Sequence, residues 1–432
     1  MFLSSYLKIY PYPEKPGGFL LYSTRRASLI LVPASTLHAI EAGTLSAADR
    51  ETLARLGMLV PDPALEKEEM RLRFDEANRR RRKFSAVVVL NLDCNLACTY
   101  CYEGSIRGKR YMSAETADLL VEVIERDHLA RGKKVALDFY GGEALLSTGL
   151  IKSISGRLQK SAQAEGLDYS FNIVTNGTLL TRPVAQELAV LGMQGAKFTL
   201  DGPRDIHDSF RPFVSGKGSF AAIIDNLKSV CDVIKVQVGG NYTRDNYREF
   251  PRLLDSLLAE GLTPARLSLV KFDPVTGRAG GAGIPDFKSG CDCSSEPWLH
   301  EASLFLREEI LKRGYNTPRP APAACMVEFL DDTVINYDGS IWKCPAFIGW
   351  EGLVVGDLKS GLGDYRSSHN LDVWKKEECL DCAYLPFCFG GCRFLKLLRD
   401  GRIDDVDCRK AYFDATLGEF IRQDLRLRPK KG

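Results

Sequence analysis

The chain has 432 residues, of which 45% are hydrophobic and 26% are charged. This length exceeds one ordinary hydrophobic core, so we expect two or three domains. The 58 basic and 56 acidic residues leave a net charge of +2, which argues against a large nucleic-acid-binding surface. No long uncharged apolar stretch predicts a membrane span, and prolines and glycines at positions 11–18 interrupt any signal peptide, so we expect a cytoplasmic protein without membrane contact.

Residues 1–62 are predicted to form a small α+β module that resembles a winged helix. Apolar runs at 19–22 and 29–32 predict two strands joined by a turn, and two short helices follow, the second beginning after Ser46. Residues 58–60 are predicted to form a third strand. Such a module has an exposed strand edge that can bind an extended peptide by strand addition, although a simple packing extension of the next domain explains the pattern equally well.

Residues 63–84 are strongly charged and end in five consecutive basic residues. Acidic and basic side chains at helical spacing predict a solvated linker helix, and the basic run is better explained by a solvated helix face than by a nucleic-acid site.

Residues 85–284 alternate between strand-like and helix-like segments. Six repeats of this kind predict an α/β fold with a parallel sheet curled into a partial (β/α)6, TIM-like barrel. In such barrels the chemistry lies on loops at the carboxyl ends of the strands. The expected strands cover 87–92, 135–140, 169–174, 197–200, 234–241 and 265–270, and the helices between them include 114–126, 182–191, 220–230 and 250–258.

The remaining chain divides into a bridging region, 285–319, and a cysteine-dense domain with a basic tail, 320–432. The thirteen cysteines are unevenly distributed: three lie at 94–101, nine lie between Cys291 and Cys408, and Cys231 is expected to be an ordinary buried residue. Because the cytosol keeps thiols reduced, this clustering indicates metal centres in at least two places. Bound metal is expected to supply much of the folding energy of the small C-terminal domain.

The first group has the spacing Cys94-x3-Cys98-x2-Cys101 and directly follows the first predicted barrel strand. Three thiolates on one tight loop suit an iron–sulfur cluster that leaves one iron open to a small molecule. Zinc sites usually contain paired C-x2-C units with four ligands, so a zinc site or a disulfide with one free thiol is the weaker alternative.

This loop resembles the signature loop of the radical S-adenosylmethionine (SAM) enzymes. The resemblance implies a [4Fe-4S] cluster on Cys94, Cys98 and Cys101, with SAM bound to its fourth iron and cleaved reductively to a 5′-deoxyadenosyl radical. Tyr100 matches the aromatic residue that packs near the cluster and adenine. The cofactor carries out the difficult step, while the protein orients it and excludes water.

Polar motifs after the next four strands match further positions of that family. Glu143, in a Gly-Gly-Glu motif, would receive the SAM ammonium, although Ala144 stands where the family often has proline; Thr199 and Asp201 would bind the ribose. Turn formation alone is the alternative for Asn-Gly and Asp-Gly pairs. His207 and Arg211 belong to a motif typical of peptide-modifying members, and His207 is not expected to be a catalytic base. The implied SAM contacts are Gly141, Gly142, Glu143, Thr175, Asn176, Thr199, Asp201 and Asn241.

The C-terminal cysteines resemble the SPASM extension of radical SAM enzymes, which binds two auxiliary [4Fe-4S] clusters. The fourth ligand of the inner cluster is left open between Cys291, Cys293 and an iron that binds a substrate thiolate. A structural zinc site is the alternative for the C-x2-C unit. The resemblance assigns Cys379, Cys382, Cys388 and Cys408 to the outer cluster and Cys325, Cys344 and Cys392 to the inner one.

Together these features resemble a radical SAM/SPASM peptide maturase, with some similarity to the geopeptide-maturase branch. The resemblance implies three [4Fe-4S] clusters, a precursor peptide with a leader sequence bound by the N-terminal module, and a reductase, flavodoxin or ferredoxin as electron donor. A thioether or related cross-link is the expected product, because Pro345 follows Cys344 where sulfatase-maturing enzymes have a proton-accepting Asp. Epimerisation and formylglycine formation are the alternatives, and an electron-transfer protein or a zinc-stabilised peptide-binding scaffold is the rival of another class.

Overall fold

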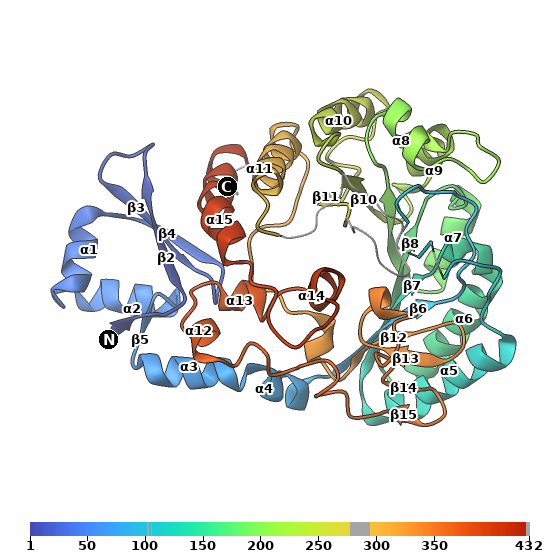
Figure 1. The fold of residues 1–432 in the computed structure, drawn as a ribbon, viewed down its shortest axis with the longest axis horizontal. Coiled ribbons are helices and arrows are strands. Elements are labelled where there is room, and N and C mark those ends of the chain that lie inside the picture. The colour runs from blue at the N-terminus through green and yellow to red at the C-terminus, as the bar shows by residue number, and fades with distance from the viewer. Residues whose placement is uncertain (102, 105, 277–293, 429–432) are drawn as a thin grey trace. The chain divides into compact units, whose positions relative to one another are not determined.

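The computed structural model describes residues 1–101, 103–104, 106–276 and 294–428 (Figure 1). Backbone contacts divide the chain into two compact units. The first unit combines residues 1–80, 319–329 and 370–422, and the second combines residues 81–318, 330–369 and the chain from 423 onward. The cysteine-rich region therefore contributes to both units.

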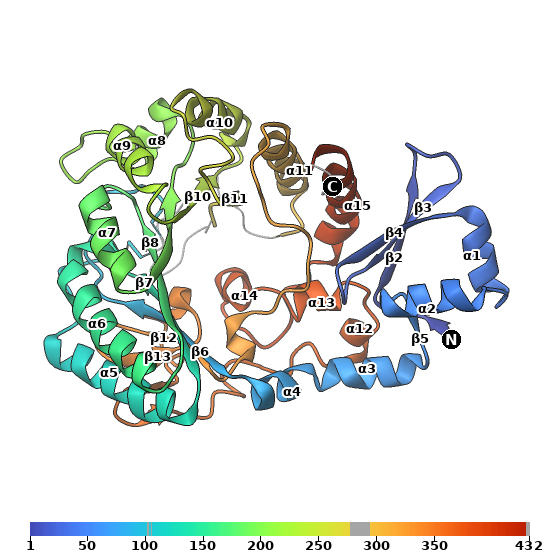
Figure 2. The ribbon, with the colours of Figure 1, turned by 180° about the vertical axis from the view of Figure 1, so that it is seen from behind.

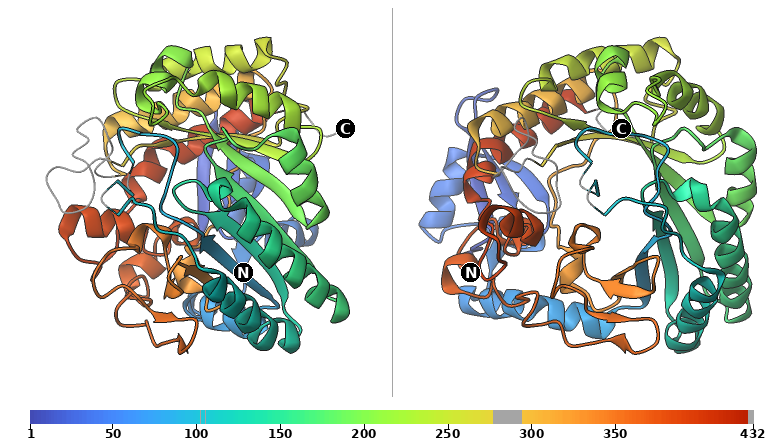
Figure 3. Two further views of the ribbon diagram at one scale, coloured as in Figure 1. Left: turned by 90° about the vertical axis from the view of Figure 1, so that its right-hand side faces the viewer. Right: turned by 45° about the vertical axis from the view of Figure 1, so that its right-hand side comes forward.

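The second unit is built on one sheet of ten strands, in the order β11-β10-β9-β8-β7-β6-β12-β13-β14-β15. Every pairing from β6 to β11 is parallel, and Figure 3 shows this part of the sheet as a curved wall with helices along its outer side. This confirms the predicted partial barrel. The parallel strands are β6 (Lys83–Val89), β7 (Lys134–Tyr140), β8 (Tyr169–Thr175), β9 (Met193–Thr199), β10 (Lys235–Tyr242) and β11 (Leu269–Pro274).

The helices of this unit bury one apolar face each. In α5, for example, Leu120, Val121 and Ile124 are fully buried at helical spacing. Cys231 ends α9 and is only half-buried, which corrects the expectation of a buried cysteine. The helices and 3₁₀ turns are α5 (Ala114–Asp127), η1 (Leu129–Arg131), η2 (Ala144–Ser147), α6 (Thr148–Ala164), α7 (Arg182–Val190), α8 (Arg204–Phe210), α9 (Phe220–Val230), η3 (Tyr247–Glu249), α10 (Phe250–Ala259), α11 (Pro297–Lys312) and η5 (Pro345–Phe347).

Four further strands extend the barrel sheet beyond its first strand. They are β12 (Asp332–Ile335), β13 (Ser340–Trp342), β14 (Gly356–Asp357) and β15 (Gly361–Leu362). β12 pairs in parallel with β6, and the rest follow as antiparallel neighbours. The sequence did not predict them, since strands of two to four residues are too short for a period-two pattern to emerge.

The N-terminal part of the first unit contains an antiparallel sheet of order β2-β3-β4, visible in Figure 2. The sequence prediction missed its first strand, which contains Pro11. The strand predicted at 58–60 is present as β5, which pairs with β1. The elements are β1 (Phe2–Leu3), β2 (Leu7–Tyr12), β3 (Gly18–Ser23), β4 (Ser28–Pro33), α1 (Ala34–Glu41), α2 (Ala47–Arg55) and β5 (Leu59–Val60).

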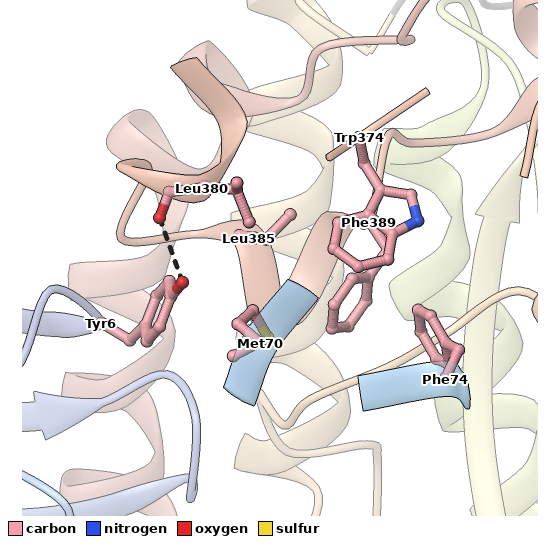
Figure 4. Close-up of a cluster of buried hydrophobic side chains, with 7 residues drawn as sticks. All are labelled: Tyr6, Met70, Phe74, Trp374, Leu380, Leu385 and Phe389. Atoms are coloured by element: carbon pink, nitrogen blue, oxygen red, sulfur yellow. Dashed lines mark hydrogen bonds between the residues drawn. The ribbon is translucent and has the colours of Figure 1, made fainter. Parts of the chain in front are cut away.

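The charged linker is not one solvated helix but two short helices with a buried side, α3 (Pro63–Arg71) and α4 (Arg73–Arg80). Met70 and Phe74 are buried in a cluster with Trp374 and Phe389 of the cysteine-rich segment (Figure 4). The Tyr6 hydroxyl donates a hydrogen bond to the Leu380 carbonyl in the same cluster, at 3.0 Å. The charge pattern concealed this apolar stripe, which has only two large side chains.

The cysteine-rich part of the first unit consists of short helices joined by turns. They are η4 (Met326–Glu328), α12 (Glu377–Leu380), α13 (Leu385–Cys388), α14 (Arg393–Asp400) and the long α15 (Lys410–Leu427), whose first part lies in this unit. The apolar side chains of α15, Phe413, Leu417 and Ile421, pack against Leu20 and Tyr22 of β3. Among the described residues no helix is both long enough and apolar enough to span a membrane.

Candidate functional site

The three-cysteine loop follows β6 and is held against the segment that follows α8. Backbone amides of Ala97 and Thr99 donate to the carbonyl oxygens of Pro212 and Phe210, at 2.7 and 3.0 Å. The Cys94 sulfur accepts the Leu96 amide at 3.4 Å. The loop is therefore fixed through its main chain at the carboxyl end of the first barrel strand, where barrel chemistry is expected.

The three sulfurs lie close enough to affect one another electrostatically. Burial is the main cause of a raised pKa at Cys94, Cys98 and Cys101. The pKa of Cys101 rises to about 11, where Glu103 is the next cause and the two neighbouring thiols add to the shift. Without metal these groups are thus neutral thiols, and a bound iron would have to displace their protons. The residues that the structure describes include no group of three or more His, Cys, Asp or Glu side chains placed to hold a metal ion. The three cysteines nevertheless share one loop, and thiols are the side chains that hold iron–sulfur clusters.

The Gly-Gly-Glu segment after β7 lies directly against the loop that carries Cys94. A Cβ atom on Gly142 would lie 2.3 Å from the Asp93 carbonyl oxygen, so only glycine fits there. The Glu143 amide donates to that same oxygen at 2.8 Å. The glycine therefore permits a backbone contact that joins the first two strand ends.

The Glu143 carboxylate is buried and serves as a clamp between strand ends. It accepts the amide of Leu145 at 3.0 Å, the hydroxyl of Thr175 at 2.8 Å and the amide of Asn176 at 2.8 Å. Burial raises its pKa, and these three donors oppose that shift. A carboxylate has about four acceptor positions, so one remains for an external cation such as an ammonium group.

Asn176 connects this clamp to the cysteine loop. Its side-chain amide donates to the Asn95 side-chain oxygen at 2.8 Å and approaches the Cys94 sulfur at 3.7 Å. Asn91, just after β6, also stabilises this region, since its side-chain amide donates to the Glu143 backbone carbonyl at 3.0 Å. Asn91 was not among the predicted site residues; only its position at the end of the first strand could have indicated it.

Asp201 lies at the centre of a second, fully internal network. The Tyr100 hydroxyl donates to its carboxylate, and the Asn241 amide donates to it at 2.7 Å. Arg211 donates to the Tyr100 oxygen at 2.8 Å and lies 3.6 Å from the Asp201 carboxylate. The Asp201 side chain has no exposed surface. The structure thus brings Tyr100, Asp201 and Asn241 together, and adds Arg211.

The hydrogen bonds of His207 identify it as a structural residue. Its Nδ1 atom accepts the Asp201 amide at 3.1 Å, and its Nε2 atom lies 3.0 Å from the Ser219 hydroxyl. Burial first and Arg211 second lower the pKa of His207 to about 3, so the ring is neutral at ordinary pH. We assign the Nε2–H tautomer from this network. The ring positions the loop that carries Asp201.

Thr199 differs from its neighbours in this site. It ends β9 opposite Gly239 of β10 and is half-buried. Its hydroxyl forms no hydrogen bond with any residue that the structure describes. A hydroxyl at a strand end without an internal partner is free to bind a ligand.

Most cysteines of the C-terminal region lie in the first unit. Burial raises the pKa of Cys379 to about 11, and its neighbours Cys388, Cys382 and Cys408 add to that shift. Cys392 likewise contributes to the raised pKa of Cys325, for which burial is the main cause. Cys344 belongs to the second unit, where it precedes η5. Cys291 and Cys293 lie outside the described residues.

Comparison with known proteins identifies the barrel. Residues 88–257 match the Radical SAM superfamily. The Fe-coproporphyrin III synthase of Methanosarcina barkeri is 32% identical over 180 residues, which cover 40% of this chain and 41% of that protein. A cysteine-type anaerobic sulfatase-maturating enzyme of Clostridium novyi is 24% identical over 377 residues, covering 78% of this chain and 96% of the relative.

Solved structures agree at the level of the fold. The anaerobic sulfatase-maturating enzyme anSMEcpe with bound AdoMet gives a TM-score of 0.62 at 17% identity and covers 79% of this chain and 98% of that one. Streptococcus suis SuiB bound to its precursor peptide SuiA gives a TM-score of 0.51 at 15% identity, with 95% of this chain and 99% of that chain covered. The cysteine loop at the end of β6, the curved parallel sheet and the family match agree that residues 88–257 form a radical SAM domain.

Proposed function

We propose that this radical SAM enzyme modifies a ribosomally made precursor peptide and holds three [4Fe-4S] clusters. The matches to a sulfatase-maturating enzyme and to SuiB with its precursor peptide support a peptide substrate. The observation that carries the proposal is the combination, in one chain, of the barrel site with an N-terminal sheet that has an open edge strand.

For each cluster we propose a set of cysteine ligands. Cys94, Cys98 and Cys101 would hold the SAM-binding cluster, and the four cysteines around Cys379 an auxiliary one. Cys325, Cys344 and Cys392 would hold the other, with its fourth position open or filled by Cys291 or Cys293. When bound, the first cluster and SAM supply a 5′-deoxyadenosyl radical for hydrogen abstraction.

The chain's own residues would orient SAM at the strand ends. The remaining acceptor position of Glu143 suits the SAM ammonium, and the free hydroxyl of Thr199 suits a ribose oxygen. Asp201 would act through Tyr100, by holding that ring next to the cluster loop, rather than by direct contact with the ribose. The same site would be shaped by the backbone and side-chain polar groups of its other members: Gly141, Gly142, Thr175, Asn176 and Asn241.

The open edge of β4 is the proposed site for a leader peptide. β2, at the other edge of the sheet, is less available for strand addition. Pro11 lacks an amide hydrogen, and its carbonyl already accepts a hydrogen bond from Arg422, at 3.4 Å. Among the strands that the structure describes, β4 pairs only with β3, and Leu31 on it is 38% exposed. An extended peptide could therefore add to β4 through main-chain hydrogen bonds.

For the product we propose a thioether between a cysteine sulfur and a carbon of the precursor. Hydrogen abstraction from that carbon and loss of the thiol proton form the C–S bond, and the remaining electron passes to an auxiliary cluster. The absence of an acid after Cys344, where Pro345 stands, favours this over formylglycine formation. The similarity to sulfatase-maturating enzymes keeps formylglycine formation as the second candidate, and epimerisation as the third.

The test is anaerobic co-expression with small open reading frames that neighbour the gene, followed by mass spectrometry of each peptide. A thioether requires loss of two hydrogens together with a cysteine that no longer reacts with iodoacetamide. Conversion of cysteine to formylglycine would remove sulfur, and an epimer would keep its mass but yield a D-residue on hydrolysis. Absence of 5′-deoxyadenosine when reduced enzyme meets SAM would instead favour a pure electron-transfer protein.

The electron donor is proposed to be a flavodoxin, a ferredoxin or their reductase, acting in the cytoplasm. Reduction of the reconstituted clusters by each candidate, followed by EPR spectroscopy, would identify it. The cluster count has its own test, since three [4Fe-4S] clusters predict about twelve irons per chain.

A further inference from the structure

A pocket with a volume of about 580 Å³ lies within the first unit, apart from the barrel site. Its walls come from the turn between β3 and β4, from α3 and α4, and from the segment 322–324. Three aromatic side chains, Phe74, Phe329 and Phe389, line it together with the guanidinium groups of Arg25 and Arg73. Its size suits a side chain or a small group rather than a flat protein surface.

Arg73 is the unsatisfied group of this pocket. Among the described residues it forms no ion pair or hydrogen bond, although Glu69 and Glu76 lie within one helical turn of it and also line the pocket. Glu69 pairs instead with Arg25 at 2.5 Å, and Glu76 pairs with Arg80 at 2.7 Å. Arg73 is half-buried, and its partial burial and the charge of Arg25 lower its pKa. A half-buried cation without a counter-ion is electrostatically costly, so it favours an anionic ligand.

The aromatic wall beside Arg73 is held in a strained conformation. The Arg73 guanidinium lies 5.8 Å from the centre of the Phe389 ring. Phe389 has a φ of 41°, in the left-handed region that ordinarily favours glycine, and two glycines follow it directly. Its ring packs edge-on against Phe74, at 4.7 Å, and against Trp374, at 5.3 Å. A left-handed conformation is unfavourable for a residue with a side chain, so the packing of this ring must compensate for it.

Charge and shape together define the ligand. The Arg73 guanidinium lies beside the Phe389 ring and forms no ion pair with a described residue. This arrangement suits a carboxylate attached to an apolar or aromatic body, since guanidinium can bind a carboxylate through two parallel hydrogen bonds. The pocket also lies near the proposed leader site, because Arg25 precedes the first residue of β4, Ser28, by three positions. A peptide strand paired with β4 would therefore leave the sheet next to this pocket.

We propose that this pocket binds an acidic side chain of the precursor peptide, with Arg73 as the carboxylate-binding group. The identity of the ligand as the precursor peptide rests on the proposed function. The preference of the pocket for a carboxylate rests on its own residues. An acidic surface of an electron-donor protein is the competing occupant, and the test below separates the two.

The test uses the full chain with reconstituted clusters and a bead-bound library of random twelve-residue peptides. The selected peptide is then measured by fluorescence anisotropy against wild type, Arg73→Met, Arg73→Lys and Arg79→Met. Arg79 is the matched control, because it lies on α4, is exposed and does not line the pocket. Circular dichroism and iron content establish that each variant is folded and loaded.

The proposal predicts selection of peptides with Asp or Glu next to an apolar residue. Arg73→Met should weaken their binding roughly tenfold or more, as should amidation of the acidic residue, and the two changes together should cost little more than either alone. Arg73→Lys should retain part of the affinity, and Arg79→Met all of it.

Three results would overturn the proposal: no acidic preference, equal losses in Arg73→Met and Arg79→Met, or unchanged peptide binding with slower cluster reduction by flavodoxin in Arg73→Met. The last result would assign the pocket to the electron donor. These results are distinguishable from failure of the proposed function. A protein that modifies no peptide can still bind acidic peptides through Arg73, and a peptide maturase can bind its precursor without using Arg73.

Discussion

The buried pair of Arg211 and Asp201 allows a stability prediction whose magnitude follows from the structure. Their side chains are 11% and 0% exposed, and the nitrogen–oxygen distance is 3.6 Å. Burial opposes the charge of Arg211, but the nearby Tyr100, Asp201 and Cys98 together raise its pKa well above the usual value. Arg211 is therefore always charged, and Asp201 depends on it for compensation.

Replacing Arg211 by methionine leaves the Asp201 carboxylate buried without its cation. Breaking one partner of a buried pair typically costs about 3–5 kcal/mol. The double variant Arg211→Met, Asp201→Asn should recover a large part of that loss, since no charge then remains buried. The control is Arg182→Met, which breaks a pair with Asp232 at 2.7 Å whose side chains are 45% and 55% exposed. Exposed pairs contribute about 0–1 kcal/mol.

The assay is urea denaturation followed by circular dichroism, on anaerobically reconstituted protein, with a comparison of the m-values. Unchanged m-values allow the shift in midpoint to be converted into a free energy of unfolding. Equal losses in Arg211→Met and Arg182→Met, or no recovery in the double variant, would refute the view that Arg211 compensates a buried charge.

Three further outcomes are expected. Thr199→Val should lower SAM affinity at unchanged stability, whereas Asp201→Asn should lower stability more than affinity; equilibrium binding and urea midpoints compare them. Burial lowers the pKa of His128 from about 6.5 to about 4, so between these pH values the unfolded protein binds a proton at His128 and the folded protein does not. The free energy of unfolding should therefore fall by up to roughly 3 kcal/mol as pH falls from 6.5 to 4, and His128→Asn should reduce this pH dependence. Cys379→Ser should lose about four of roughly twelve irons, whereas Cys231→Ser should keep them all in an iron assay.

His128 owes this behaviour to its particular surroundings. Its ring stacks on Phe84 with 3.7 Å between the ring centres, and its Nδ1 atom is buried without a partner. Asp331 and Asp127 favour the protonated form, but burial and the cations Lys133 and Arg131 outweigh them. A pH dependence that remains in His128→Asn would point to other groups, such as His207.

The barrel could be predicted from sequence because parallel strands leave a strong local pattern. Apolar runs followed by polar, glycine-rich turns located all six strands within a few residues, although the first begins at Lys83 rather than Val87 and the last at Leu269 rather than Ala265. The shift of the first strand has a simple cause: Lys83 and Ser85 are polar and alternate with buried Phe84 and Ala86, so the strand begins before its apolar run.

The first unit resisted prediction because its contacts join distant parts of the chain. Residues 63–80 look like a solvated helix, yet Met70 and Phe74 pack with Trp374, which lies about three hundred residues later. Nothing local distinguishes these two apolar side chains from the scattered exposed ones of a surface helix. The left-handed Phe389 is similar, since only the surrounding rings account for a phenylalanine in a conformation suited to glycine.

Asp201 illustrates where motif and mechanism separate. Its place after β9 suggested a ribose contact, because carboxylates at strand ends commonly bind ligand hydroxyls. In the structure its carboxylate is already bound by Tyr100, Asn241 and Arg211, while Thr199, two residues earlier, keeps a hydroxyl without an internal partner. A motif thus locates a site, but the hydrogen bonds within the chain determine which of its members remain free. If Asp201 sets the position of Tyr100, its substitution should disturb the cluster loop first, and SAM binding only as a consequence.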